Sequence, residues 1–332
     1  MMIISRTPVR ISFFGGGTDY PEYYLRKKGA VLGTTINKYT YISINTLSDF
    51  FDHKIRLGYS KTELVKHSSE IAHPSVRECL KHHGIDESLD IHIFSDLPAK
   101  TGLGSSSSFT VGFLNALYAL KGKNISKQKL AEEACFVEQN LIQENVGSQD
   151  QFHAAFGGLN ILEFTKNHIQ ARPVIISSNK LKLFEDHLLV FYTGFTRFAS
   201  EVVKEQIDNT KTLSNDIYLQ KMKEMVYAAE DIISKSSDEV FMKELGELLH
   251  HGWNLKKKLS SKISNPSIDL AYELARKAGA YGGKLCGAGS GGFLAFFVSP
   301  DKRQNVRKAL SKFLEVDFKL ENAGSSIIYM KD

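Results

Sequence analysis

The sequence predicts an α+β fold in two parts, because strand-forming and helix-forming segments are unevenly distributed along it. In the first half, short segments rich in β-branched and aromatic residues alternate with longer segments whose apolar residues recur at helical spacing. From residue 199 to about residue 278 the chain is polar, charged and helical in period, with almost no strand signal. A strand-rich first half followed by a helical second half with its own small sheet indicates an α+β architecture.

Each element follows from local composition. Strands are predicted at residues 9–14, 30–36, 39–45, 89–94, 157–164, 169–176 and 188–193. Helices are predicted at residues 109–120 and 126–143, and the chain closes with a glycine-rich turn, a strand at 293–298, a helix at 301–314 and a strand near 325–330. At roughly 150 residues per domain, 332 residues suggest two domains. We place them at residues 1–175 and 176–332.

Composition limits the classes of function. Hydrophobic residues make up 42% of the chain, and the net charge of +5 is spread without a long basic block. This balance tolerates an anionic small-molecule substrate and predicts no nucleic-acid partner. The longest apolar runs are too short to span a bilayer, and the N-terminus has no signal-peptide pattern, so we expect a cytoplasmic protein without membrane association. The sequence leaves the oligomeric state open.

A glycine- and serine-rich segment at residues 96–108 carries the strongest chemical signal. It follows a predicted strand and opens a long apolar helix. Glycines let backbone amides approach a ligand closely, and a helix start offers unpaired N–H donors to phosphate. Alternatively, the segment is a flexible linker or a helix cap without a ligand. It is not a P-loop, since the chain contains no G-x-x-x-x-G-K-[ST] pattern, and the protein-kinase motifs are missing as well.

Two further glycine-rich segments are weaker signals. Residues 6–20 run from a strand into three glycines and then Thr18 and Asp19, which could also be a tight turn with a helix cap. Residues 282–292 contain a formal G-x-G-x-x-G pattern at Gly287, Gly289 and Gly292. A dinucleotide fingerprint should open a helix, whereas residues 293–298 read as a strand, so we reject that interpretation.

Together the three segments resemble the GHMP kinases, and the resemblance covers essentially the whole chain. It implies a two-domain GHMP kinase fold, with an N-terminal mixed α/β domain and a C-terminal helical domain with a small ferredoxin-like sheet. It also implies an enzyme that uses ATP and Mg²⁺. Within the superfamily, stretches such as RTPVRISFFGGGTDYPEYY and VGSQDQFHAAFGGLN are most similar to heptose 7-phosphate kinases. Galactokinases carry Glu-His where this chain has Gly16 and Gly17, which argues against galactose.

The resemblance also implies roles for individual residues. Asp150 matches the catalytic aspartate, and Arg10 matches the arginine that pairs with it and faces the transferred phosphoryl group. Ser106 and Glu138 match the magnesium ligands. The ATP phosphates would be held by Gly102, Leu103, Gly104, Ser105, Ser106, Ser107 and Ser108. The acceptor would be bound by Asp19, with Gly16, Gly17, Thr18, Gly287 and Gly289 forming the walls around it.

The implied reaction is ATP-dependent phosphorylation of the anomeric O1 of D-glycero-D-manno-heptose 7-phosphate, which would supply nucleotide-activated heptose for surface polysaccharide. Alternatives are a kinase for fucose, galactose or a uronic acid, an ATP-dependent decarboxylase, and a relative that only binds ligand. Arg197 follows a predicted strand and a glycine, at the start of a helical segment. We expect it to hold the 7-phosphate, although it could instead be a surface arginine paired with Glu201 or Glu205.

Overall fold

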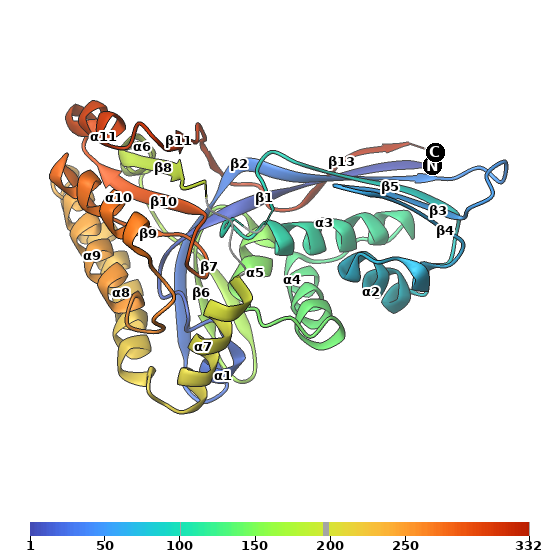
Figure 1. The fold of residues 1–332 in the computed structure, drawn as a ribbon, viewed down its shortest axis with the longest axis horizontal. Coiled ribbons are helices and arrows are strands. Elements are labelled where there is room, and N and C mark those ends of the chain that lie inside the picture. Colours follow the sequence, from blue (N-terminus) through green and yellow to red (C-terminus); the bar gives the residue numbers. More distant parts are fainter. Residues whose placement is uncertain (100, 195–198, 332) are drawn as a thin grey trace.

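The computed structural model describes residues 1–99, 101–194 and 199–331, and the strands of these residues form two sheets (Figure 1). The larger, nine-stranded sheet has the order β13 (Ser326–Lys331), β1 (Met2–Phe14), β2 (Gly29–Thr46), β5 (Leu89–Ser95), β3 (Ile55–Gly58) and β4 (Thr62–Val65), with β6 (Leu159–Phe164) and β12 (Leu320–Glu321) paired to β2 and β7 (Ile169–Pro173) paired to β6. The smaller sheet has the order β11 (Leu314–Glu315), β8 (Leu188–Tyr192), β10 (Phe293–Val298) and β9 (Ala280–Leu285). The predicted α+β architecture in two parts is therefore confirmed.

The long antiparallel pair β1–β2 extends along the whole large sheet (Figure 1). The sequence predicted separate strands at residues 30–36 and 39–45, whereas β2 is continuous. The register shifts where Pro8 and Val9 face Tyr39 and Ile36, so the two intervening residues of β2 bulge out of the ladder. Such a bulge bends a strand without ending it. This is why the sequence pattern predicted two strands where the structure has one.

Helices cover one face of the large sheet (Figure 1). They are α2 (Pro74–His83), α3 (Ser105–Leu120), α4 (Lys127–Phe136) and α5 (Gln149–Phe156), with the short turns α1 (Pro21–Tyr24) and η1 (Ser68–Glu70) at its margins. The predicted helix at residues 126–143 is shorter than expected, because α4 continues as one π-helical turn, η2 (Val137–Leu141). π-Helical turns occur frequently at functional sites.

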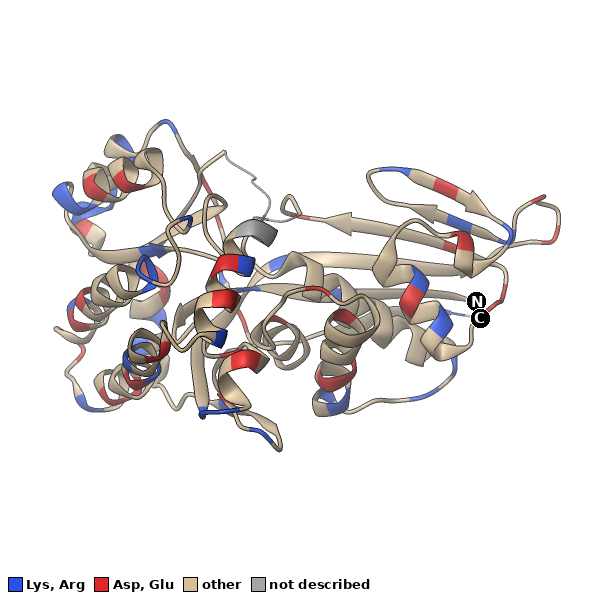
Figure 2. Cartoon of the chain, turned by 60° about the horizontal axis from the view of Figure 1, so that its bottom comes forward, with Lys and Arg blue, Asp and Glu red and all other residues tan. Residues whose placement is uncertain are grey.

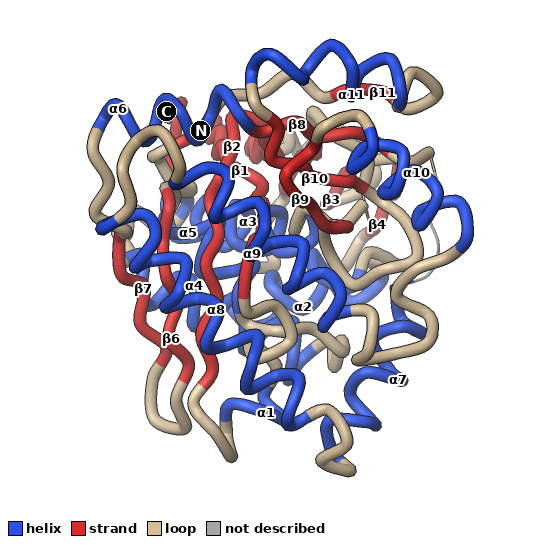
Figure 3. Tube along the Cα trace, turned by 90° about the vertical axis from the view of Figure 1, so that its left-hand side faces the viewer, coloured by secondary structure: helices blue, strands red, loops and turns tan. Residues whose placement is uncertain are grey.

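The helices of the second half lie beside the smaller sheet, the large sheet or α1, as Figures 1 and 3 show. They are α6 (Ser178–His187), α7 (Ala199–Lys211), α8 (Asp216–Lys235), α9 (Phe241–Lys256), α10 (Pro266–Lys277), η3 (Pro300–Lys302) and α11 (Arg303–Ala309). The helix predicted at residues 301–314 is thus shorter, and its last residue already belongs to β11. Figure 3 shows α8 and α9 in front of the large sheet, and α8 contacts both β1 and β2.

A shared hydrophobic core fixes the two sheets against each other. Phe13 of β1 packs against Phe184 of α6 and Phe297 of β10, with ring centroids 5.2 and 5.5 Å apart. All three rings are at most 3% exposed. A close-packed core of this kind holds its walls in place. A cavity bounded by both sheets is therefore preorganised.

The last two strands return to the large sheet, where β13 pairs with β1 and brings the two termini together (Figure 1).

The domain limits at residues 175 and 176 stay a prediction. Among the described residues, no helix has both the length and the apolar character needed to cross a membrane. Figure 2 shows basic and acidic residues interspersed over both parts of the chain.

Candidate active site

A cavity of about 380 Å³ lies where the two parts of the chain meet. Its walls come from β1 and the turn after it, the loop before α3, the loop before α5, α7, the end of α9, β9 and the glycine-rich loop after β9. This volume suits a small-molecule site. All three glycine-rich segments identified in the sequence contribute to the cavity.

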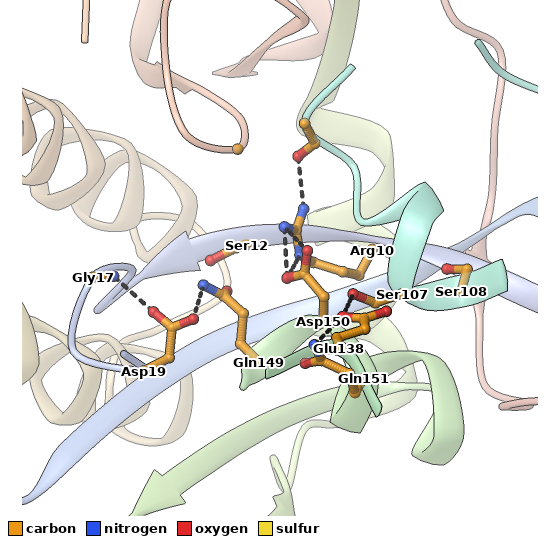
Figure 4. Close-up of polar contacts among 12 residues, drawn as sticks. Arg10, Ser12, Gly17, Asp19, Ser107, Ser108, Glu138, Gln149, Asp150 and Gln151 are labelled. Carbon is orange, nitrogen blue, oxygen red and sulfur yellow. Dashed lines mark hydrogen bonds and ion pairs between the residues drawn. The ribbon is translucent and has the colours of Figure 1, made fainter. Parts of the chain in front are cut away.

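An ion pair between Arg10 and Asp150 lies at this cavity (Figure 4). The Arg10 Nε and Nη2 atoms donate to the two carboxylate oxygens of Asp150, each at 2.7 Å. Arg10 Nη1 donates to the Gly102 carbonyl at 2.7 Å, and the Arg10 amide donates to the Leu103 carbonyl at 2.9 Å. Arg10 is 4% exposed, so its fork is held rigidly. The arginine thus connects Asp150 to the loop that opens α3.

The N-terminus of α3 is open towards the cavity. Gly104 occupies the N-cap position in a left-handed conformation, with φ of 76°, and no side chain caps the helix. Ser105 and Ser106 follow it and line the cavity. Uncapped first-turn amides and the positive end of the helix dipole attract an anion. This helix start can therefore receive phosphate oxygens.

The glycine-rich segments at residues 96–108 and 282–292 touch each other. A Cβ atom at Gly102 would collide with the Cys286 carbonyl, and one at Gly292 would collide with the Thr101 carbonyl. Gly102 and Gly292 also have positive φ angles, of 88° and 111°. Only glycine meets both conditions without strain. The loop after β9 leads into the strand β10 and not into a helix, which confirms that it is no dinucleotide fingerprint, and it closes one side of the cavity through Gly287.

Asp19 lines the cavity from the turn after β1 and is 1% exposed (Figure 4). Its Oδ1 accepts a hydrogen bond from the Gly17 amide and its Oδ2 accepts one from Gln149 Nε2, both at 2.8 Å. Burial raises the pKa of the Asp19 carboxyl above its ordinary value. Gln149, which directly precedes Asp150 in the sequence, therefore orients the Asp19 carboxylate.

The predicted site residues as a whole fall into three groups by their position relative to the cavity. Those that line the cavity are Arg10, Gly16, Gly17, Asp19, Gly102, Gly104, Ser105, Ser106, Asp150 and Gly287. Those that are not among its lining residues are Thr18, Leu103, Ser107, Ser108, Glu138 and Gly289. Thr18 bonds to the carbonyls of Gly15 and Ala30, and Ser108 bonds to the Pro8 carbonyl, so both hydroxyls hold backbone in place. Arg197 lies outside the described residues.

Glu138 lies in the π-helical turn η2 and is 1% exposed. Its Oε2 atom accepts hydrogen bonds from Ser107 Oγ at 2.9 Å and Gln151 Nε2 at 2.5 Å (Figure 4). Its Oε1 atom is also buried, and no hydrogen bond of good geometry reaches it from the described residues. Burial raises the pKa of Glu138 to about 7. The serine that contacts this carboxylate is Ser107, while the Ser106 side chain is exposed in the cavity.

Several cavity residues were missed in the sequence. Gln149 lies beside Asp150, and Gln206 of α7 reaches the cavity from a helix that carried no motif. Lys284 lies in the glycine-rich segment at residues 282–292. A charged residue within a buried strand could have marked it as a candidate site residue. Lys256 is the first of three consecutive lysines, and nothing local distinguishes it from its neighbours. Such residues become visible only when the elements are placed together.

Comparison with known proteins agrees with this geometry. The family described as GHMP kinases N terminal domain matches residues 64–158, and GHMP kinases C terminal matches residues 239–316. The D-glycero-alpha-D-manno-heptose 7-phosphate kinase of Campylobacter jejuni is 29% identical over 323 residues, 93% of both chains. The bifunctional fucokinase/GDP-fucose pyrophosphorylase of Arabidopsis thaliana is 27% identical over 345 residues, which cover 95% of this chain and 32% of that protein.

A solved structure of a D-glycero-D-manno-heptose 1-phosphate kinase from Bacteroides thetaiotaomicron superposes with a TM-score of 0.80. It covers 99% of this chain and 100% of its own at 22% identity, a likeness that shows the fold. The chain belongs to the GHMP kinase superfamily, and it has that family's two-domain fold, with a large N-terminal sheet and a small antiparallel sheet in its C-terminal part. It is an ATP-dependent kinase of this family.

Proposed function

We propose that this kinase transfers the γ-phosphate of ATP to the anomeric O1 of D-glycero-D-manno-heptose 7-phosphate and forms the 1,7-bisphosphate. The observation that carries the proposal is the Arg10–Asp150 pair at the cavity, beside the uncapped start of α3. The choice of heptose is supported by the Campylobacter jejuni kinase, whose similarity extends over 93% of both chains. The product would serve the synthesis of nucleotide-activated heptose for surface polysaccharide.

The proposed step needs one base and several fixed positive groups. Asp150 takes the proton of the anomeric hydroxyl, which is more acidic than an ordinary alcohol, as its oxygen attacks the γ-phosphorus. The new bond joins O1 to that phosphorus, the bond from phosphorus to the bridging oxygen of ADP breaks, and ADP leaves. Arg10 and the first amides of α3 stabilise the negative charge on the migrating phosphoryl group. Asp19 accepts hydrogen bonds from the sugar hydroxyls.

The residues at this site fit a magnesium ion. Ser106 offers an exposed hydroxyl in the cavity, and Glu138 offers a buried carboxylate oxygen that lacks a well-placed donor among the described residues. These two residues would hold the ion, since Mg²⁺ prefers oxygen ligands and retains several waters. Bound there, it would offset the negative charge of the ATP phosphates.

We therefore expect activity to require Mg²⁺ or Mn²⁺, and Glu138→Gln to raise the metal concentration for half-maximal rate by about 10–100-fold, the range commonly seen when a metal site loses a partner. The amide is similar in size but is neutral and a poorer metal ligand. Titration of metal at fixed ATP measures the effect.

The matched control is Glu133→Gln. Glu133 lies on α4 one turn before Glu138, but its carboxylate bonds to His83 and Tyr118, away from the cavity. Its substitution should leave the metal requirement unchanged. If Glu138→Gln titrated like wild type and like this control, Glu138 would have a structural role only.

The acceptor is tested by measuring kcat/KM for heptose 7-phosphate, unphosphorylated heptose, fucose, galactose and a uronic acid, with products identified by mass. We expect heptose 7-phosphate to give the highest value and a product heavier by one phosphoryl group. A higher value for fucose would favour the second candidate, a fucose kinase, which the 27% identity with the plant fucokinase supports. A product that lost carbon dioxide and kept no phosphate would identify a decarboxylase.

A further inference from the structure

Two buried lysines at the cavity have no role in the reaction as described. Lys256 ends α9 and Lys284 lies in β9, and both line the cavity wall. Lys256 is 6% exposed and Lys284 is 4% exposed. Burial of an ammonium group is costly unless an anion or several acceptors surround it. Two such groups in one wall therefore call for a common explanation.

Each ammonium group has only part of its hydrogen-bonding capacity used by the described residues. Lys284 Nζ donates to the Ser12 carbonyl at 2.6 Å, and Lys256 Nζ donates to the Gly287 carbonyl. No described carboxylate forms an ion pair with either lysine. Because an ammonium group carries three donors, both lysines retain donors for a ligand. Burial is the largest cause that lowers the pKa of Lys284 to about 7 and that of Lys256 to about 8, and the charge of the Asp19 carboxylate offsets only part of this effect.

The Ser12 side chain adds a third unused donor. Ser12 is 4% exposed and lines the cavity, yet its hydroxyl has no hydrogen-bond partner among the described residues. Its carbonyl is the acceptor for Lys284 of β9, so the ammonium group lies beside the same residue of β1 that carries the hydroxyl. Buried hydroxyl groups are rarely left without a partner unless a ligand or water supplies one.

Ser12 and Lys284 lie on the acceptor side of the Arg10–Asp150 pair, and Lys256 bonds to the Gly287 carbonyl in the loop that closes the cavity. Arg10 is bonded to the loop that opens α3, where the ATP phosphates are expected. Ser12 follows Arg10 by two residues along β1, in the direction of Asp19. At the usual rise of a strand, this separates the two Cα atoms by roughly 7 Å. The lysine bonded to Ser12 is therefore displaced from the ATP side towards the proposed sugar site.

We propose that Lys256, Lys284 and the Ser12 hydroxyl bind the phosphate group that the acceptor sugar already carries. The inference rests on the proposed function and names the part of the cavity that would recognise the 7-phosphate. A phosphate monoester carries about −1.5 to −2 charges at neutral pH, and its oxygens are strong acceptors. Two ammonium groups match that charge, whereas a carboxylate would neutralise only one of them. A phosphate on the sugar thus fits better than a uronic acid.

The test is steady-state kinetics of Lys284→Met and Lys256→Met on heptose 7-phosphate and on unphosphorylated heptose. Each variant is expected to raise KM for heptose 7-phosphate by roughly 10–100-fold, the loss expected for a charge-assisted hydrogen bond. The corresponding loss on unphosphorylated heptose should be at least about tenfold smaller, because that sugar lacks the anion. The KM for ATP should change little.

Two further variants separate recognition from folding. Lys284→Gln retains a donor for the Ser12 carbonyl but removes the charge, and should show the same selective loss. Lys221→Met removes a charge from an exposed position on α8, outside the cavity, and should behave as wild type. Thermal unfolding is the second readout. Removal of a buried unpaired cation should leave the melting temperature of Lys284→Met unchanged or higher, whereas a purely structural lysine would give a lower one.

Each outcome decides between the two proposals. Equal losses on both sugars, or a raised KM for ATP, would overturn the lysine inference and leave the heptose kinase proposal in place. If wild type preferred another phosphorylated sugar and Lys284→Met selectively weakened that one, the heptose assignment would fall and the phosphate site would stand. If wild type did not distinguish phosphorylated from neutral sugars, both would be wrong.

Discussion

Asp150→Asn is expected to lower kcat by about 10²–10⁴-fold, the usual effect of losing a general base. The Asp150 carboxylate lines the cavity and is held by both arms of the Arg10 fork at 2.7 Å. Asparagine keeps the shape of the side chain but cannot take the proton of the sugar hydroxyl. The KM for ATP should be nearly unchanged, because the ATP phosphates are expected at the start of α3. A coupled assay of ADP release measures both constants.

Asp90→Asn is the matched control for this change. Asp90 forms a comparable two-armed ion pair with Arg56, with Nε and Oδ1 2.7 Å apart, between β5 and β3 and outside the cavity. It should keep normal turnover, which would show that loss of an arginine–aspartate pair does not by itself impair the enzyme. Near-normal turnover of Asp150→Asn would remove Asp150 from the mechanism.

Arg10→Met is expected to lower kcat by about 10²–10³-fold, as does removal of a donor that stabilises charge in a transition state. The change removes the positive charge beside the proposed position of the migrating phosphoryl group and the hydrogen bond to the Gly102 carbonyl. Arg10→Lys should recover only part of the rate, because an ammonium group lacks the planar fork that holds both carboxylate oxygens. Single-turnover kinetics at saturating ATP would report the chemical step directly.

A double variant tests whether Arg10 and Asp150 act as one unit. If they do, Arg10→Met combined with Asp150→Asn should cost little more than the more severe single change, since groups that act together are far from additive. Arg56→Met serves as the control for loss of a paired arginine elsewhere in the sheet. Fully additive losses would instead show that the two residues act independently, and the pairing at 2.7 Å would then have no catalytic meaning.

Sequence-based prediction succeeded for the elements that depend on neighbouring residues and failed for those that depend on distant ones. The strand at Phe293–Val298 has the predicted bounds, and the glycine- and serine-rich segment opens a helix as predicted, although α3 begins at Ser105 rather than at residue 109. The bulge that keeps β2 continuous was not predictable, since it depends on pairing with β1. The π-helical turn that places Glu138 was also missed, because its residues have the same apolar spacing as an ordinary helix.

The sequence by itself determined the three glycine-rich segments, their order, and the residue types able to bind phosphate, metal and sugar. These are properties of a few consecutive residues, such as the freedom of Gly102 to adopt a positive φ. Only the tertiary structure decided which groups meet. Arg10 and Asp150 are 140 residues apart, and Lys284 and Ser12 are 272 apart. Strand register and the core shared by the two sheets set those distances, and no local pattern encodes them.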